Sequence, residues 1–104
     1  MKTSELTGAA LDWAVAKCEV GAEFIGEIDD PHFYSTDWAL GGVIIERERI
    51  ELRDAGGDGW AADDNLHATQ YGDTPLIAAM RCYVASKLGD EVEVPEELLS
   101  CAHD

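Results

Sequence analysis

One segment, residues 35–42, gathers the side chains best suited to bind a small molecule. Its short polar residues accept hydrogen bonds or cap helices. Trp38 offers a large flat ring with one N–H donor, and the two glycines allow close backbone approach or present consecutive N–H groups to an anion. Trp60 is a second ring for stacking, and Arg47 is a cation for an anionic group. We predict a site for a nucleotide-like ligand formed by Ser35, Thr36, Asp37, Trp38, Gly41, Gly42, Trp60 and Arg47.

The same segment also fits a purely structural role. In that alternative, its polar residues cap a short helix, Trp38 fills the core and the two glycines form a turn after the helix. No Gly-Lys-Ser/Thr follows, so the segment is not a phosphate-binding P-loop. Arg47 has an alternative of its own, because residues 46–49 alternate in sign as on a solvated face with ion pairs. The sequence leaves both interpretations open.

The chain carries no recognisable catalytic or metal-binding motif. His32, His67 and His103 belong to no paired motif, and no G-x-S-x-G or H-E-x-x-H string occurs. The aspartates between positions 54 and 64 lack the spacing of a calcium-binding loop and its closing glutamate. Carboxylates are so frequent that no pair stands out for acid–base work. We therefore predict a non-catalytic protein with no cofactor and no metal site.

Length and charge narrow the class of protein. The 104 residues include 22 acidic and 7 basic ones, for a net charge of −15, and 46% are hydrophobic. This length predicts one compact domain, residues 1–104, in which the residues after about 100 form a frayed tail. The hydrophobic content is too high for a disordered acidic tail. The acidity argues against direct binding to a nucleic-acid backbone or to an anionic membrane, which both attract clustered Lys and Arg.

The acidic residues form three clusters, at Glu23–Asp30, Asp54–Asp64 and Asp90–Glu97. Duplex DNA carries one negative charge per ~1.7 Å of helix axis, so a protein that mimics it must concentrate carboxylates along one face. Charges spread evenly over the surface would only favour solubility. The sequence does not decide whether the three clusters converge, and a DNA mimic therefore stays open.

Two main helices are predicted from apolar spacing. The first follows Thr7, a potential cap, and Gly21 lies beyond its end. The second opens at Thr74-Pro75, a capping residue followed by proline at the first helical position, and stops at Gly89. Their apolar stripes comprise Leu11, Ala14, Val15 and Cys18 in the first, and Leu76, Ile77, Met80, Tyr83, Val84 and Leu88 in the second.

The strand signals are shorter. Residues 50–53 alternate, residues 54–59 have turn chemistry, and residues 60–62 can return as a hairpin partner. Residues 92–94 also alternate and could pair with residues 1–3. Few regular signals occur between the first helix and this hairpin. We predict an α+β fold, in which a small antiparallel sheet packs against two main helices.

Cysteine use and the N-terminus indicate an intracellular protein. Cys18, Cys82 and Cys101 are an odd number without the spacing of a disulfide framework, so we expect a reducing compartment. The first residues contain no apolar leader, and no window approaches 18 apolar residues. We expect a soluble protein of the cytoplasm. Because a domain this small gains buried apolar surface by self-association, we also expect a homo-oligomer.

Three segments, residues 1–16, 34–46 and 74–89, resemble a known family. They read MKTSELTGAALDWAVA, YSTDWALGGVIIE and TPLIAAMRCYVASKLG. They look like the NinX-like family of small phage proteins, and the resemblance covers nearly the whole chain. Leu40 and Val43 stand where the family more often has Gln and Pro. The resemblance implies a phage or prophage accessory protein made inside a bacterium, and it brings no settled activity and no catalytic residues.

Three functional hypotheses follow. The first is a phage-encoded, non-catalytic protein that sequesters a small nucleotide-like ligand for host takeover or counter-defence. The second is an acidic inhibitor or DNA mimic that blocks a basic, nucleic-acid-binding host defence protein. The third is a small nucleotide-processing enzyme that uses a carboxylate as base. Salt separates the first two, because affinity between charged faces falls steeply with ionic strength and stacking in a pocket does not.

Overall fold

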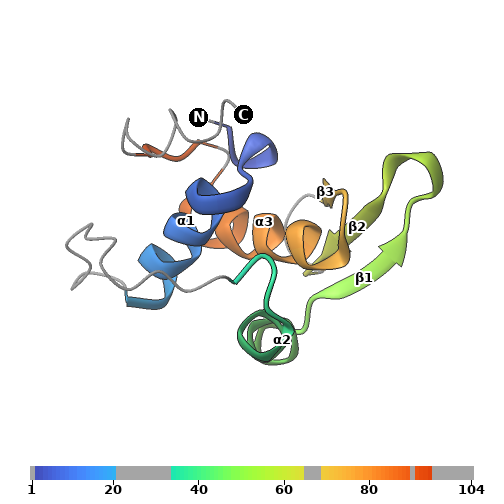
Figure 1. The fold of residues 1–104 in the computed structure, drawn as a ribbon, viewed down its shortest axis with the longest axis horizontal. Coiled ribbons are helices and arrows are strands. Elements are labelled where there is room, and N and C mark those ends of the chain that lie inside the picture. The colour runs from blue at the N-terminus through green and yellow to red at the C-terminus, as the bar shows by residue number, and fades with distance from the viewer. Residues whose placement is uncertain (1, 21–33, 65–68, 90, 95–104) are drawn as a thin grey trace.

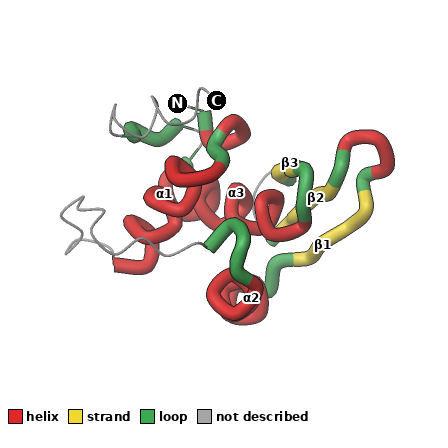
Figure 2. Tube along the Cα trace, viewed as in Figure 1, coloured by secondary structure: helices red, strands yellow, loops and turns green. Residues whose placement is uncertain are grey.

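The computed structural model describes residues 2–20, 34–64, 69–89 and 91–94 (Figure 1). Three helices and a three-stranded antiparallel sheet confirm the predicted α+β class. The sheet lies to one side of the helices (Figure 2). In chain order the elements are η1 (Thr3–Glu5), α1 (Gly8–Val20), α2 (Trp38–Glu48), β1 (Glu51–Asp54), η3 (Gly56–Asp58), β2 (Trp60–Asp63), β3 (Gln70–Gly72) and α3 (Pro75–Leu88).

Helix α3 is the central element, and α1, α2 and all three strands pack against it. It begins as predicted: Thr74 is the N-cap, its Oγ1 accepts a hydrogen bond from the Ile77 N–H at 3.1 Å, and Pro75 occupies the first turn. Its C-cap is Gly89, which has a φ of 86°. Around most of its circumference α3 is buried, as expected of a helix surrounded by other elements. The buried residues are Leu76, Ala78, Ala79, Met80, Cys82, Tyr83 and Val84.

Helix α1 confirms the first predicted helix, since it starts directly after Thr7. Its buried residues Leu11, Ala14 and Val15 enter the core that α3 also lines. Cys18 packs against the same core and Cys82 is fully part of it, so both behave as small apolar residues.

The predicted hairpin is present and continues into a third strand that the sequence did not reveal. Strand β1 pairs antiparallel with β2, from Glu51 opposite Asp63 to Asp54 opposite Trp60, and β2 pairs with β3. The turn requires glycine at position 59, where φ is 87° and a Cβ would lie 2.4 Å from the Gly72 carbonyl oxygen. Within the described residues, the predicted pairing of residues 92–94 with residues 1–3 is limited to one isolated bridge, between Lys2 and Glu91.

Helix α2 is the main departure from the predicted structure. The Gly41-Gly42 pair lies inside this helix, so the prediction of a glycine loop or turn is wrong. The alternative in which Trp38 fills the core is also wrong, because this side chain is 55% exposed. A Cβ on Gly41 would lie 2.5 Å from Leu76 Cδ2 and 2.7 Å from the Tyr34 carbonyl oxygen. Glycine therefore serves close packing of α2 against α3, an interaction that local sequence patterns do not report.

Candidate binding pocket

A pocket of about 230 Å³ lies where the segment before α2 meets the first turn of α3. Its lining residues are Ser35, Thr36, Trp38, Thr74, Pro75, Leu76 and Ile77. The structure thus brings Ser35, Thr36 and Trp38, which the sequence singled out, into one cavity. The four residues from α3 were recognised only as the start of a helix, because their proximity to residue 38 is tertiary.

The segment before α2 is anchored by Asp12 of α1. The Ser35 backbone N–H donates to Asp12 Oδ1 at 2.8 Å, and both residues are buried. Burial raises the pKa of Asp12, while the hydrogen bond from the Ser35 backbone N–H opposes that rise. The Ser35 side chain is 2% exposed, and its hydroxyl makes no hydrogen bond to the described residues. Ser35 therefore positions the pocket wall and does not present a donor at its surface.

Trp38 and Asp37 form the start of α2. Asp37 Oδ1 accepts a hydrogen bond from the Ala39 N–H at 2.9 Å, and the Asp37 carbonyl accepts one from the Gly41 N–H at 2.8 Å. The Trp38 ring lies beside Gly42, since a Cβ added there would sit 3.9 Å from Cε3. The two glycines are helical, and Gly41 is buried, so they do not present consecutive N–H groups to an anion.

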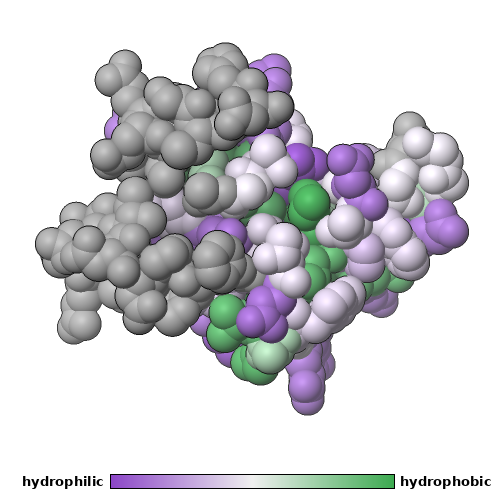
Figure 3. All heavy atoms as spheres, viewed as in Figure 1, coloured by the Kyte–Doolittle hydropathy of each residue, from purple (hydrophilic) through white to green (hydrophobic). Residues whose placement is uncertain are grey.

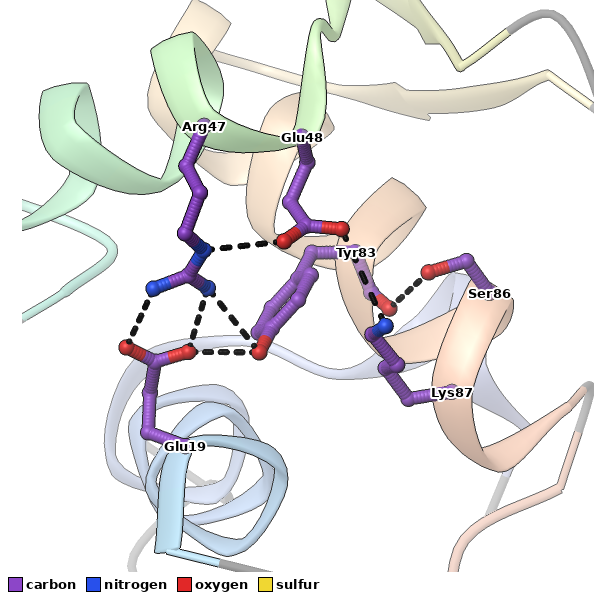
Figure 4. A network of polar contacts seen from close by, with 6 residues as sticks. All are labelled: Glu19, Arg47, Glu48, Tyr83, Ser86 and Lys87. Atoms are coloured by element: carbon purple, nitrogen blue, oxygen red, sulfur yellow. Dashed lines mark hydrogen bonds and ion pairs between the residues drawn. The ribbon is translucent and has the colours of Figure 1, made fainter.

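Arg47 lies at the opposite end of α2 and belongs to a network that ties three helices together (Figure 4). Its Nη2 donates to Glu19 Oε2 of α1 at 2.6 Å and its Nε to Glu48 Oε2 at 2.9 Å. Tyr83 of α3 donates its hydroxyl proton to Glu19, and Lys87 pairs with Glu48 at 3.8 Å. Hydrogen bonding to the guanidinium holds the pKa of Glu19 below its usual value. This network matches the ion-paired alternative for Arg47.

Trp60 does not line the pocket either. It opens β2, where it is half-buried and packs against the hydrophobic core. Of the eight predicted site residues, the pocket includes three and Asp37 caps the adjoining helix. Gly41 and Trp60 serve packing, Arg47 serves ion pairing, and Gly42 lies within α2. The predicted Arg47 anchor and Trp60 platform are therefore absent from this pocket.

Elsewhere in the described part of the chain, no feature is a stronger candidate for a functional site than this pocket. A second cavity, of about 270 Å³, is lined by Lys2, Thr3, Ser4, Gln70 and Glu91. Within the described ranges no three His, Cys, Asp or Glu side chains gather as a metal site would need, and no helix is long and apolar enough to cross a membrane.

On the face that Figure 3 shows, hydrophilic side chains are scattered among apolar ones. The cluster Glu23–Asp30 and most of Asp90–Glu97 lie outside the described residues, as do His32, His67, Cys101 and the predicted frayed tail. The cluster Asp54–Asp64 extends from the end of β1, through the turn, to the residue directly after β2. Convergence of the three clusters therefore stays a prediction.

The pocket and the three-helix network both fall within a region that matches a known family. No curated protein matches the chain. A family model described as "Bacteriophage P22, NinX" matches residues 2–87, which include α1, α2, all of the sheet and α3 as far as Lys87. Because this match spans most of the sequence, the chain belongs to the phage NinX family.

Proposed function

We propose that this phage protein is a non-catalytic accessory protein that binds a small nucleotide-like molecule in the pocket between the starts of α2 and α3. Acting in the cytoplasm of the bacterial host, it would sequester that molecule for host takeover or counter-defence. The observation that carries the proposal is Trp38, whose 55% exposed ring borders a pocket with an otherwise mainly apolar wall. Exposed aromatic rings beside a pocket supply stacking surface for bases.

The chemistry of the lining supports binding over catalysis. Among the seven lining residues there is no carboxylate, imidazole, thiol or amine that could transfer a proton or attack a substrate. The two cysteines within the described chain are held in the core, where burial raises the pKa of each thiol to about 12. Such thiols are poor nucleophiles near neutral pH.

Native mass spectrometry of the protein purified from a bacterial host, with analysis of denatured extracts, tests the proposal. We expect a stoichiometric small molecule, and we expect Trp38→Ala to weaken its binding by about 5- to 150-fold, the range given by about 1–3 kcal/mol of stacking. Tyr71→Ala is the matched control, because Tyr71 is also an exposed aromatic residue (51%) but lies on β3 outside the pocket. The affinity of the Tyr71→Ala variant for the small molecule should equal that of the unmodified protein.

Other outcomes would overturn the proposal. Equal losses in Trp38→Ala and Tyr71→Ala would mean that the pocket is not the site. A protein that carries no small molecule, but captures a basic host protein with affinity that falls steeply with salt, would support the acidic inhibitor instead. A bound molecule that changes mass during incubation would show an enzyme.

A further inference from the structure

We propose that the pocket selects an uncharged planar heterocycle, a nucleobase or nucleoside, and discriminates against its phosphorylated forms. This deepens the proposed function and rests on it. Two helices begin at the pocket, and helix N-termini ordinarily attract anions through free N–H groups and the helix dipole. Here most of the groups that would receive a phosphate are already used or missing at both helices.

At the start of α2, a carboxylate already occupies the anion position. Asp37 Oδ1 accepts the Ala39 N–H at 2.9 Å, and the Leu40 and Gly41 N–H groups both donate to the Asp37 carbonyl. The carboxylate supplies the negative charge that the helix dipole favours at this end. A phosphate brought to Trp38 would meet this charge at close range, and three of the N–H groups at this end are already bonded to Asp37.

The start of α3 also offers few free N–H groups to an anion. Pro75 has no N–H, and the Ile77 N–H is bound by Thr74 Oγ1 at 3.1 Å. Asp73 directly precedes the cap and adds a further negative charge. The Thr74 hydroxyl accepts from Ile77 and retains its own proton, so it can donate to a carbonyl or ring nitrogen of a neutral ligand.

Among the described residues that line the pocket, no cation compensates for this negative charge. None of the lining residues is basic. Arg47 is held by Glu19 and Glu48 at the far end of α2. Arg81 of α3 donates Nε to the Leu6 carbonyl at 2.7 Å and Nη1 to the Tyr71 carbonyl at 2.6 Å. The net charge of −15 adds long-range repulsion of any phosphate, including one that extends out of the pocket.

The shape and lining of the pocket favour a ring. Trp38, Pro75 and Ile77 offer apolar surface, and proline and tryptophan present flat faces to a planar group. The volume of about 230 Å³ lies below the roughly 300–1,000 Å³ of pockets for drug-sized ligands. A pocket of this volume holds one ring system and little more.

Isothermal titration calorimetry with the four ribonucleosides and their 5′-monophosphates tests this selectivity. We expect at least one nucleoside to bind, and its monophosphate to bind about tenfold more weakly or worse. Asp37→Asn removes the charge and keeps an oxygen that can cap Ala39. The ratio of nucleoside affinity to monophosphate affinity should fall by about threefold or more in this variant.

Asp54→Asn is the matched control, because Asp54 Oδ1 also accepts a backbone N–H, that of Gly56 at 2.8 Å, but in the hairpin turn. It changes the net charge by the same amount, and it should leave the ratio of nucleoside affinity to monophosphate affinity unaltered. If both variants lower the ratio of nucleoside affinity to monophosphate affinity equally, the local role of Asp37 is overturned. A monophosphate that binds as tightly as its nucleoside would overturn the selectivity and leave the proposed function standing. If no nucleoside or nucleotide binds, the proposed function fails together with the inference.

Discussion

The two ends of α2 have opposite characters. At its start, Trp38 is exposed beside an uncharged pocket, and the polar groups serve helix caps. At its end, Arg47 donates hydrogen bonds to the carboxylates of Glu19 on α1 and Glu48 on α2. Its guanidinium carbon lies 5.6 Å from the centroid of the Tyr83 ring. In a chain with 7 basic residues, this arginine stabilises the fold and contributes nothing to the pocket. The difference shows that a cation in a binding-like segment of sequence can have a purely structural use.

The largest expected effect tests how α2 is seated between these two ends. Gly41→Ala places a methyl group 2.5 Å from Leu76 Cδ2 and 2.7 Å from the Tyr34 carbonyl, so it should lower the free energy of unfolding by about 1–3 kcal/mol. Gly42→Ala should instead raise it by about 0.5–1 kcal/mol, because its Cβ meets only Trp38, at 3.9 Å, and alanine favours helix. Urea denaturation measures both. Similar changes in the two variants would contradict the packing role of Gly41.

A smaller effect is expected at the network end. Glu19→Gln removes the ion pair with Arg47 and should cost about 1 kcal/mol of unfolding free energy, since the pair is partly exposed but also engages Tyr83. Glu46→Gln is the control, because Glu46 is an exposed glutamate of α2, and it should change stability by less than about 0.5 kcal/mol. Neither variant should alter ligand affinity. If Glu19→Gln abolishes binding without unfolding the protein, the two ends of α2 are coupled.

The smallest effect sharpens the same comparison through pH. The pKa of Glu19 is lowered in the folded protein, chiefly by the hydrogen bond from Arg47, so the folded state favours its charged form. That contribution is fully present above the unfolded-state pKa of about 4.3 and is lost as the pH falls below it through the folded-state pKa. The stability difference between the unmodified protein and Glu19→Gln should therefore shrink between about pH 6 and pH 3. Denaturation curves at several pH values measure this, and a difference that grows on acidification would contradict the assignment.

Local patterns predicted some elements and missed others for identifiable reasons. Thr74, Pro75 and Gly89 mark α3 because each acts on the backbone within one turn of itself. The start of α2 carries a comparable signal in Asp37, which the alternative with a capped short helix used, but the glycines at 41 and 42 lower helix propensity and concealed how far the helix continues. Packing against Leu76 explains Gly41, and that neighbour lies 35 positions along the chain.

The candidate site was predicted in part. Residues 35–42 were singled out for their chemistry, and three of them, Ser35, Thr36 and Trp38, line the pocket. Its other wall comes from α3, which no spacing within residues 35–42 could indicate. Arg47 and Trp60 were assigned to a ligand because their types suit one, whereas their partners, Glu19 for the arginine and the hydrophobic core for the tryptophan, decide their actual use.

The sequence by itself determined the α+β class, the two ends of α3, the β1–β2 hairpin and the family, because caps, alternation and long matching strings are local properties of the chain. The tertiary structure decided which of the chemically suitable residues meet. It joined the starts of α2 and α3 in one pocket, and it placed Arg47 against Glu19 at the other end of α2. Side-chain neighbours depend on how helices pack, and packing is fixed by contacts between residues far apart in sequence.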